Sequence, residues 1–135
     1  MASFDEVTRA RVAAGVWAVL VAWSLWTGGP AGPPAWSGFE AWFERFDEAG
    51  GDKLVHAVLF AVQGWLVCRI RREGVSWPWL GGCFAATSAF GVLTEAGQLA
   101  VETRTAEALD AAADVAGAAV GVGLFALLRR APPRR

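Results

Sequence analysis

The stretch VAAGVWAVLVAWSLW, from Val12 to Trp26, contains no charged side chain and decides the class of fold. A helix through residues 12–28 has about the length needed to cross roughly 30 Å of hydrocarbon. Arg9 and Arg11 precede it and small residues follow it, so a cleaved secretory signal peptide is the competing interpretation. We expect a membrane helix.

The composition extends this expectation to the whole chain. Hydrophobic residues make up 55% and charged residues 19%, against about 45–50% and about 25% in ordinary soluble domains. The excess lies in four segments that predict helices at about residues 12–28, 54–70, 77–101 and 108–128. We therefore predict an all-α membrane protein with four transmembrane helices, in one domain over residues 1–135. This composition excludes disorder and most soluble enzymes, and a net charge of -1 excludes nucleic-acid binding by bulk positive charge.

The basic residues are distributed unevenly between the two ends of the predicted helices. If the chain crosses the membrane four times, nine of the twelve fall on the side of the termini; those on the other side are Arg45, Lys53 and Arg104. Loops facing the cytoplasm carry an excess of Lys and Arg. We therefore expect a multi-pass protein with both termini in the cytoplasm.

The first outer loop contains a candidate interfacial helix over residues 37–48. Ser37-Gly-Phe-Glu40 has the form of a capping box, which opens a helix. The residues at helical spacing that would form its apolar face are Phe39, Trp42, Phe43 and Phe46. Its other face is acidic, whereas interfacial helices that bind anionic lipid are usually basic. The segment is either a lid over a membrane-facing pocket or a loop helix packed on its neighbours.

Polar residues interrupt the apolar segments near the outer membrane face. Three predicted helices each carry a pair on one face, because its members are three or four residues apart: Asp52 with His56, Glu95 with Gln98, and Asp110 with Asp114. Ionisable groups cost about 2.5–3.5 kcal/mol each at the centre of a membrane helix, so they face the bundle interior and pair with one another. With Lys53 and Arg104 at its mouth, this set is the predicted polar site.

The polar pairs belong to short sequence motifs that follow one another along the chain. These are Asp52-Lys-Leu-Val-His56, Gly91-Val-Leu-Thr-Glu95-Ala-Gly-Gln98, Arg104, and Asp110 through Asp114 to Gly121. Over about residues 50–125 the chain resembles the VanZ-like family of small membrane proteins, although many members have Asn in place of Asp114. The resemblance implies a bacterial cytoplasmic-membrane location and an association with resistance to the glycopeptide teicoplanin. It implies a topology and a site rather than a reaction.

The residue types of the polar site allow two kinds of ligand. Its carboxylates and His56 offer oxygen ligands and one imidazole, which suit a divalent metal. The chain has no compact metal motif, however, so we assign no metal or other cofactor. Lys53 and Arg104 suit a phosphate or carboxylate group, such as the head group of a lipid-linked cell-wall precursor.

Three functions remain open for this site. We favour binding or shielding of a cell-envelope ligand, either a lipid head group or a glycopeptide. A membrane hydrolase or transferase with a carboxylate or His56 as base is the alternative, but no serine or cysteine is placed as a nucleophile beside His56. The third interpretation is a network that only holds helices together, such as Asp52 or Asp110 with Arg104 and His56 with Glu95.

Two further features concern helix packing. Gly117 and Gly121 form a small-xxx-small ridge, which allows a second helix to approach closely. That helix belongs to the same chain or to a second copy, so a homo-oligomer stays open. Cys68 and Cys83 fall near the cytoplasmic side, where thiols stay reduced, and predict neither a disulfide nor a metal site.

Overall fold

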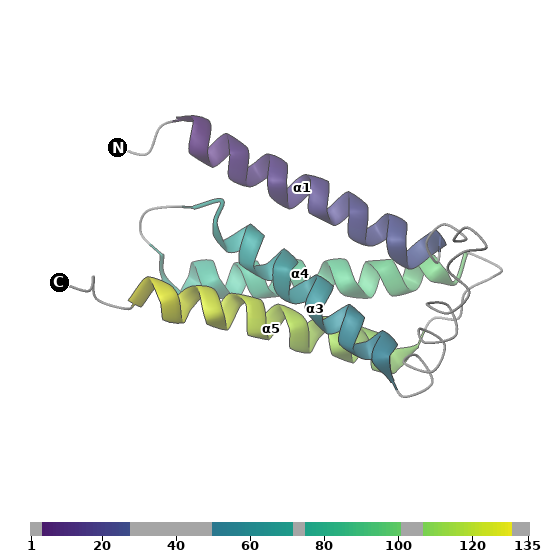
Figure 1. Ribbon diagram of the computed structural model, residues 1–135. Helices are drawn as coiled ribbons and strands as arrows, with labels where there is room; N and C mark the ends of the chain where they lie inside the picture. Colours follow the sequence, from purple (N-terminus) through teal and green to yellow (C-terminus); the bar gives the residue numbers. More distant parts are fainter. Residues whose placement is uncertain (1–3, 28–49, 72–74, 101–106, 131–135) are drawn as a thin grey trace, which may run out of the picture.

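The computed structural model describes residues 4–27, 50–71, 75–100 and 107–130 (Figure 1). All the regular secondary structure in these ranges is α-helix. Its helices are α1 (Phe4–Thr27), α3 (Gly51–Cys68), α4 (Trp77–Gln98) and α5 (Ala108–Arg130). They alternate in direction, so the start of α1 and the end of α5 lie at the same end of the bundle (Figure 1). The prediction of an all-α fold is confirmed.

The described helices differ in whether their length and hydropathy suit a membrane span. Within the described ranges, only the segment Ala108–Arg129 of α5 is both long and apolar enough to cross a membrane. The other helices are interrupted by polar side chains, such as His56 and Gln63 in α3 and Glu95 in α4. Four transmembrane helices therefore remain a prediction.

The predicted start of the first helix at residue 12 is wrong, since α1 begins at Phe4. The charged residues before the apolar stretch are helical for two reasons. Asp5 and Glu6 occupy the first turn, where negative charge interacts favourably with the helix dipole. Arg9 forms an ion pair with Asp5 one turn away, which supports an exposed helix.

The other boundaries differ by a few residues. α3 begins three residues before the predicted position, directly after Gly50, whose φ of 84° favours glycine, and it ends at Cys68 rather than 70. α4 begins at residue 77 as predicted, after Ser76, whose side chain accepts a hydrogen bond from the backbone N–H of Trp79. It ends at Gln98 rather than 101, and α5 continues to Arg130. The predicted interfacial helix at 37–48 lies outside the described residues.

The closest packing in the fold joins α3 and α5. A Cβ atom built on Gly117 would lie 2.1 Å from the carbonyl oxygen of Ala57, and one on Gly121 would lie 2.0 Å from that of Ala61. Only glycine fits at these two positions, because the backbones of the helices touch. Within the described part of the chain, the backbone of α1 packs on those of α3 and α4 and does not come close to that of α5.

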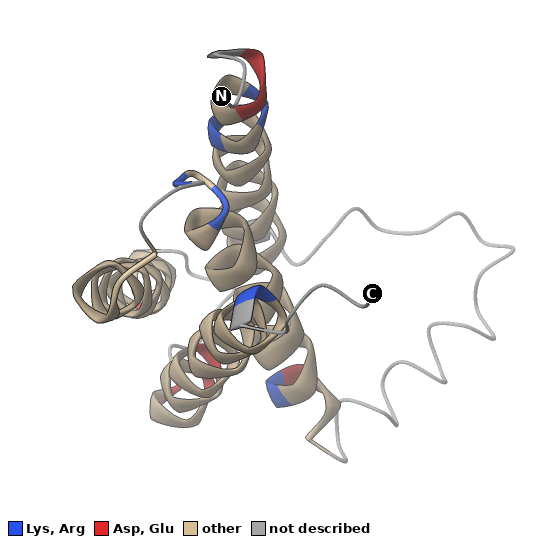
Figure 2. Ribbon diagram, turned by 90° about the vertical axis from the view of Figure 1, so that its left-hand side faces the viewer, with Lys and Arg blue, Asp and Glu red and all other residues tan. Residues whose placement is uncertain are grey.

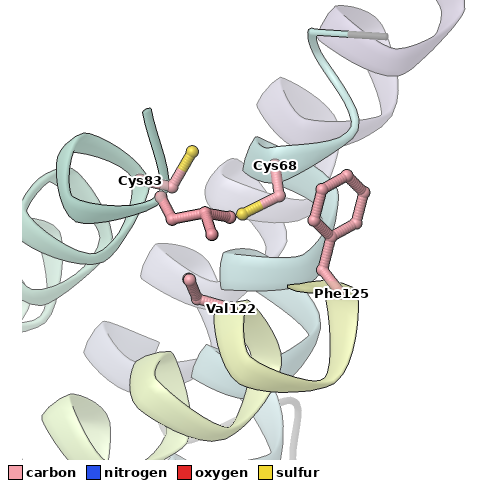
Figure 3. Packing of buried hydrophobic residues seen from close by; sticks show 5 residues of the cluster. Cys68, Cys83, Val122 and Phe125 are labelled. Atoms are coloured by element: carbon pink, nitrogen blue, oxygen red, sulfur yellow. The ribbon is translucent and has the colours of Figure 1, made fainter. Parts of the chain in front are cut away.

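A hydrophobic cluster joins α3, α4 and α5 near the end of the bundle where α3 ends (Figure 3). Its buried residues are Cys68, Leu80, Cys83, Val122 and Phe125. Both cysteines are free and buried. A smaller cluster of Val21, Leu25 and Phe60 lies between α1 and α3.

Candidate functional site

Charged residues gather where α3 begins, α4 ends and α5 begins. We call this group the acidic cluster; its members are Asp52, Lys53, His56, Glu95, Glu107, Asp110 and Asp114. The antiparallel course of the helices brings these three segments to one end of the bundle (Figure 1). At the opposite end, which faces the viewer in Figure 2, arginines lie on α1 and at the ends of α3 and α5, beside the acidic first turn of α1.

The inner part of the acidic cluster is built around His56. Its Nδ1 atom lies 2.8 Å from Oδ1 of Asp114 and 3.9 Å from Oε1 of Glu95. All three residues are buried, and Asp114 is 0% exposed. Oδ2 of Asp114 and Oε1 of Glu95 are buried without a hydrogen-bond partner. Buried polar atoms normally have a partner, so these two oxygens need an explanation.

A glycine makes room for the buried aspartate. A Cβ atom built on Gly91 of α4 would lie 2.8 Å from Cβ of Asp114 and 3.0 Å from its Oδ2. Any larger residue at Gly91 would push the Asp114 side chain away from its place between α3 and α4. The GVLTEAGQ segment thus contributes a small residue to the site as well as Glu95.

The outer part of the acidic cluster is organised by Lys53. Its Nζ lies 2.5 Å from Oδ2 of Asp52, 3.0 Å from Oδ1 of Asp110 and 3.1 Å from Oε2 of Glu107. Both Asp52 and Lys53 precede the predicted span at 54–70. The hydrogen bond to Asp52, followed by those to Asp110 and Glu107, raises the pKa of Lys53 above its usual value. Burial favours a higher pKa for Asp52, but its bonds to Lys53 outweigh burial and lower that pKa.

Glu107 is a member of this cluster that the sequence did not predict. The backbone N–H of Glu107 donates to Oε2 of Glu95 at 3.1 Å, while the Glu107 side chain binds Lys53. The first N–H groups of a helix lack partners within the helix, and Glu95 supplies one at the start of α5. The available signal was the spacing of Glu107 three residues before Asp110, just outside the apolar segment.

Among the predicted site residues that the structure describes, one does not join the cluster. Gln98 is buried, but its Nε2 donates to the carbonyl oxygen of Leu25 at 3.1 Å, so it ties α4 to α1. Arg104 lies outside the described residues. The expected pairing of His56 with Glu95 is the longer of two contacts, since Asp114 lies nearer to the ring.

The charge of the acidic cluster determines what it can attract. Five carboxylate side chains surround one lysine and one histidine. Lys53 is already engaged by three of them, so it is not an open phosphate-binding cation as the sequence suggested. A phosphate would be repelled here, whereas a cationic group or a metal ion would be attracted.

A pocket of about 390 Å³ lies away from this cluster, at the other end of the bundle. Residues of α1, the end of α3 and the end of α5 line it, and its charged residues are Glu6, Arg9, Arg69 and Arg129. Arg9 is paired with Asp5, so Arg69 and Arg129 against Glu6 leave a small positive excess that favours an anionic occupant. The two ends of the bundle therefore differ in the charge of what they attract.

No family model, no curated protein and no solved structure matches this chain. The likeness to the VanZ-like family rests on the residues quoted above and stays a hypothesis.

Proposed function

We propose that this chain is a four-span protein of the bacterial cytoplasmic membrane, of the VanZ-like kind, that binds a positively charged group of a cell-envelope ligand at the acidic cluster. The observation that carries the proposal is the excess of carboxylates at one end of an apolar bundle.

The outer surface of the helices supports the membrane location. Large apolar side chains point away from the bundle on different helices: Val19 is 68% exposed, Leu93 66% and Leu127 67%. Helices of 18 to 24 residues are about 27 to 36 Å long at 1.5 Å per residue. A hydrocarbon core of about 30 Å would cover these side chains along most of each helix.

The charge at the two ends supports the orientation. The arginine-lined pocket and the ends of α3 and α5 lie together with the start of α1. Basic groups favour the cytoplasmic face, and arginines there pair with the phosphates of anionic lipids. The acidic cluster then lies in the outer leaflet, within reach of envelope ligands.

The outermost carboxylates suit an amino group that approaches from outside, since Lys53 contacts only one oxygen of each, Oδ2 of Asp52 and Oε2 of Glu107. The Asp52 side chain is 30% exposed and that of Glu107 is 50% exposed, so both are accessible from the mouth of the site. An aminated lipid head group or a glycopeptide with an amine fits this charge, whereas a bare phosphate does not. The association with teicoplanin that the family resemblance implies belongs to the second class.

Co-purification tests the binding proposal directly. The protein is extracted in native lipid particles, and bound small molecules are identified by mass spectrometry. We expect wild type to retain an amine-bearing envelope molecule, and the double variant D52N/E107Q to retain at least about tenfold less. R69Q, at the other end, is the matched control and should behave as wild type. Recovery of bulk phospholipid alone from wild type would contradict ligand binding.

Abundance separates binding from a purely structural role. D52N/E107Q is expressed beside wild type, and teicoplanin susceptibility and membrane abundance are both measured. Loss of the phenotype at unchanged abundance supports a binding site, whereas a parallel fall of both supports a structural network. A reporter fused after Arg135 should read cytoplasmic; a periplasmic reading would remove the four-span topology.

A further inference from the structure

We infer that His56, Glu95 and Asp110 form a binding site for a divalent transition-metal ion, of the Zn²⁺ class, in the inner part of the acidic cluster. This site adjoins the proposed ligand-binding carboxylates Asp52 and Glu107, because Asp110 also contacts Lys53 at 3.0 Å, but it does not require an envelope ligand.

The three residues converge from different helices. His56 lies on α3, Glu95 on α4 and Asp110 on α5, and one potential ligand atom from each lies within 4.8 Å of the other two. All three are buried, at 6%, 6% and 7% exposure. Atoms that bind one Zn²⁺ lie about 3 to 4 Å apart, given bonds of about 2.0 to 2.2 Å. Small side-chain rotations therefore close the remaining gap.

Glu95 has a buried carboxylate oxygen without a partner, which is independent evidence for a bound cation. Its Oε2 accepts the backbone N–H of Glu107 at 3.1 Å, which holds the carboxylate in place. Its Oε1 is buried, has no hydrogen-bond partner and lies 3.9 Å from Nδ1 of His56. An unpaired carboxylate oxygen in such a place is unfavourable without a cation, and a metal ion would satisfy it.

The surroundings of His56 match those of a metal-bound histidine. Such residues use one ring nitrogen for the metal and hold the ring by a hydrogen bond from the other to a carboxylate or carbonyl. Asp114, 2.8 Å from Nδ1, provides a carboxylate of this kind, so Nε2 is the ring nitrogen that would bind the metal. One imidazole with carboxylates suits Zn²⁺ or Mn²⁺ better than Mg²⁺ or Ca²⁺, which prefer oxygen ligands alone.

A second group of acidic residues in the same cluster could also hold a metal ion, so the two groups must be compared. Asp52, Glu107 and Asp110 also converge closely enough for a metal. That outer group already holds a cation, because the ammonium of Lys53 contacts all three carboxylates. In the described residues no lysine or arginine pairs with the inner group apart from the contact of Lys53 with Asp110. The inner group is therefore the one with a place for an ion.

Metal titration of the purified protein tests the site. The full chain in detergent is stripped with a chelator, incubated with ZnCl₂ alone, dialysed, and its zinc measured by mass spectrometry; Co²⁺ absorption reports the ligand geometry. We expect one equivalent per chain and an affinity at least about 10- to 100-fold weaker in E95Q, because the loss of a group that only supports a metal ligand already costs that much. D5N, a carboxylate variant on α1, is the control and should bind as wild type.

Two outcomes decide against the site. Folded wild type that binds neither Zn²⁺, Co²⁺ nor Mn²⁺ at micromolar concentration overturns it, and so does a loss in E107Q with none in E95Q, which places the ion in the outer group. If E95Q does not fold by circular dichroism and gel filtration, D110N takes its place. Metal binding without any retained envelope molecule would refute the proposed function and leave this site standing.

Discussion

Nδ1 of His56 on α3 lies 2.8 Å from Oδ1 of Asp114 on α5, and the two residues are only 6% and 0% exposed. The contact is possible because the backbones of these helices touch at Gly117 and Gly121, one and two turns beyond Asp114. A buried pair between two helices in direct contact holds each helix at one rotation about its own axis. It therefore aligns the rest of the acidic cluster.

Removing the carboxylate of Asp114 should destabilise the protein strongly. In D114A, His56 loses its nearest partner in a place that solvent does not reach, and breaking a buried pair costs about 3–5 kcal/mol. We expect a loss of that size in the free energy of unfolding, measured by SDS titration in detergent micelles. D114N keeps a hydrogen-bonding oxygen and should lose less.

A double-mutant cycle isolates the pair itself. H56A/D114A should be more stable than the sum of the single losses predicts, by about 1 kcal/mol or more. L93A, at a residue 66% exposed, controls for side-chain truncation and should change stability by about 0.5 kcal/mol or less. Additive losses in the cycle would show that the contact contributes nothing.

Adding one methyl group at the α3–α5 contact should push the helices apart. In G121A the new Cβ would meet the carbonyl oxygen of Ala61 at 2.0 Å, which only a backbone shift can relieve. Overpacking of this kind costs about 1–3 kcal/mol. Gly123 provides the matched control, because a Cβ there meets nothing within 4 Å. G123A should stabilise α5 by up to about 1 kcal/mol, and equal effects of the two variants in the same unfolding assay would argue against the close approach.

The sequence predicted which helix faces would meet, but not how they pair. Spacing placed Asp52 with His56 and Asp110 with Asp114 on common faces, and the structure brings both pairs to one end of the bundle. Spacing cannot give the rotation of one helix against another, which depends on where the backbones touch. For that reason Gln98, on the same face as Glu95 by sequence, binds the carbonyl of Leu25 on α1 instead.

Residues at the boundaries of the helices were also difficult to predict from the sequence. Hydropathy separates apolar segments from loops. It did not predict Glu107 as a site residue, because Glu107 lies just outside the apolar segment at 108–128. Its part in the cluster depends on its backbone N–H as much as on its side chain. The first turn of a helix offers free N–H groups to any nearby carboxylate, and only the fold shows that Glu95 is nearby.

Neutralising Lys53 should make stability depend on acidity. K53M leaves the carboxylates of Asp52, Glu107 and Asp110 close together without their shared cation, so we expect K53M to be less stable than wild type at pH 7. The difference should shrink as the pH falls, because without Lys53 the pKa of Asp52 is no longer lowered and protonation of this carboxyl relieves the repulsion. In wild type the pKa of Lys53 is raised from 10.5, so its contribution is complete below that pH and is lost only as the pH rises further. Thermal unfolding of both proteins from pH 4 to 9 measures this, and a pH-independent difference would contradict it.

The docking of α1 should depend on Trp26. Its indole N–H donates to the carbonyl oxygen of Thr94 on α4 at 3.1 Å, and its ring lies where a Cβ on Gly97 would come within 2.7 Å. W26F removes the hydrogen bond and should cost about 1 kcal/mol, while hydrogen exchange in the second half of α1 should become faster. V19A, at an outward position 68% exposed, should leave that exchange unchanged. In the described residues the backbone of α1 does not come close to that of α5, and the pocket that both helices line lies at the far end of α5. Exchange in the first half of α5 should therefore stay at the wild-type rate in both variants. Faster exchange in α5 would mean that α1 also supports the α3–α5 pair, and unchanged exchange in α1 of W26F would mean that the indole bond does not hold the helix.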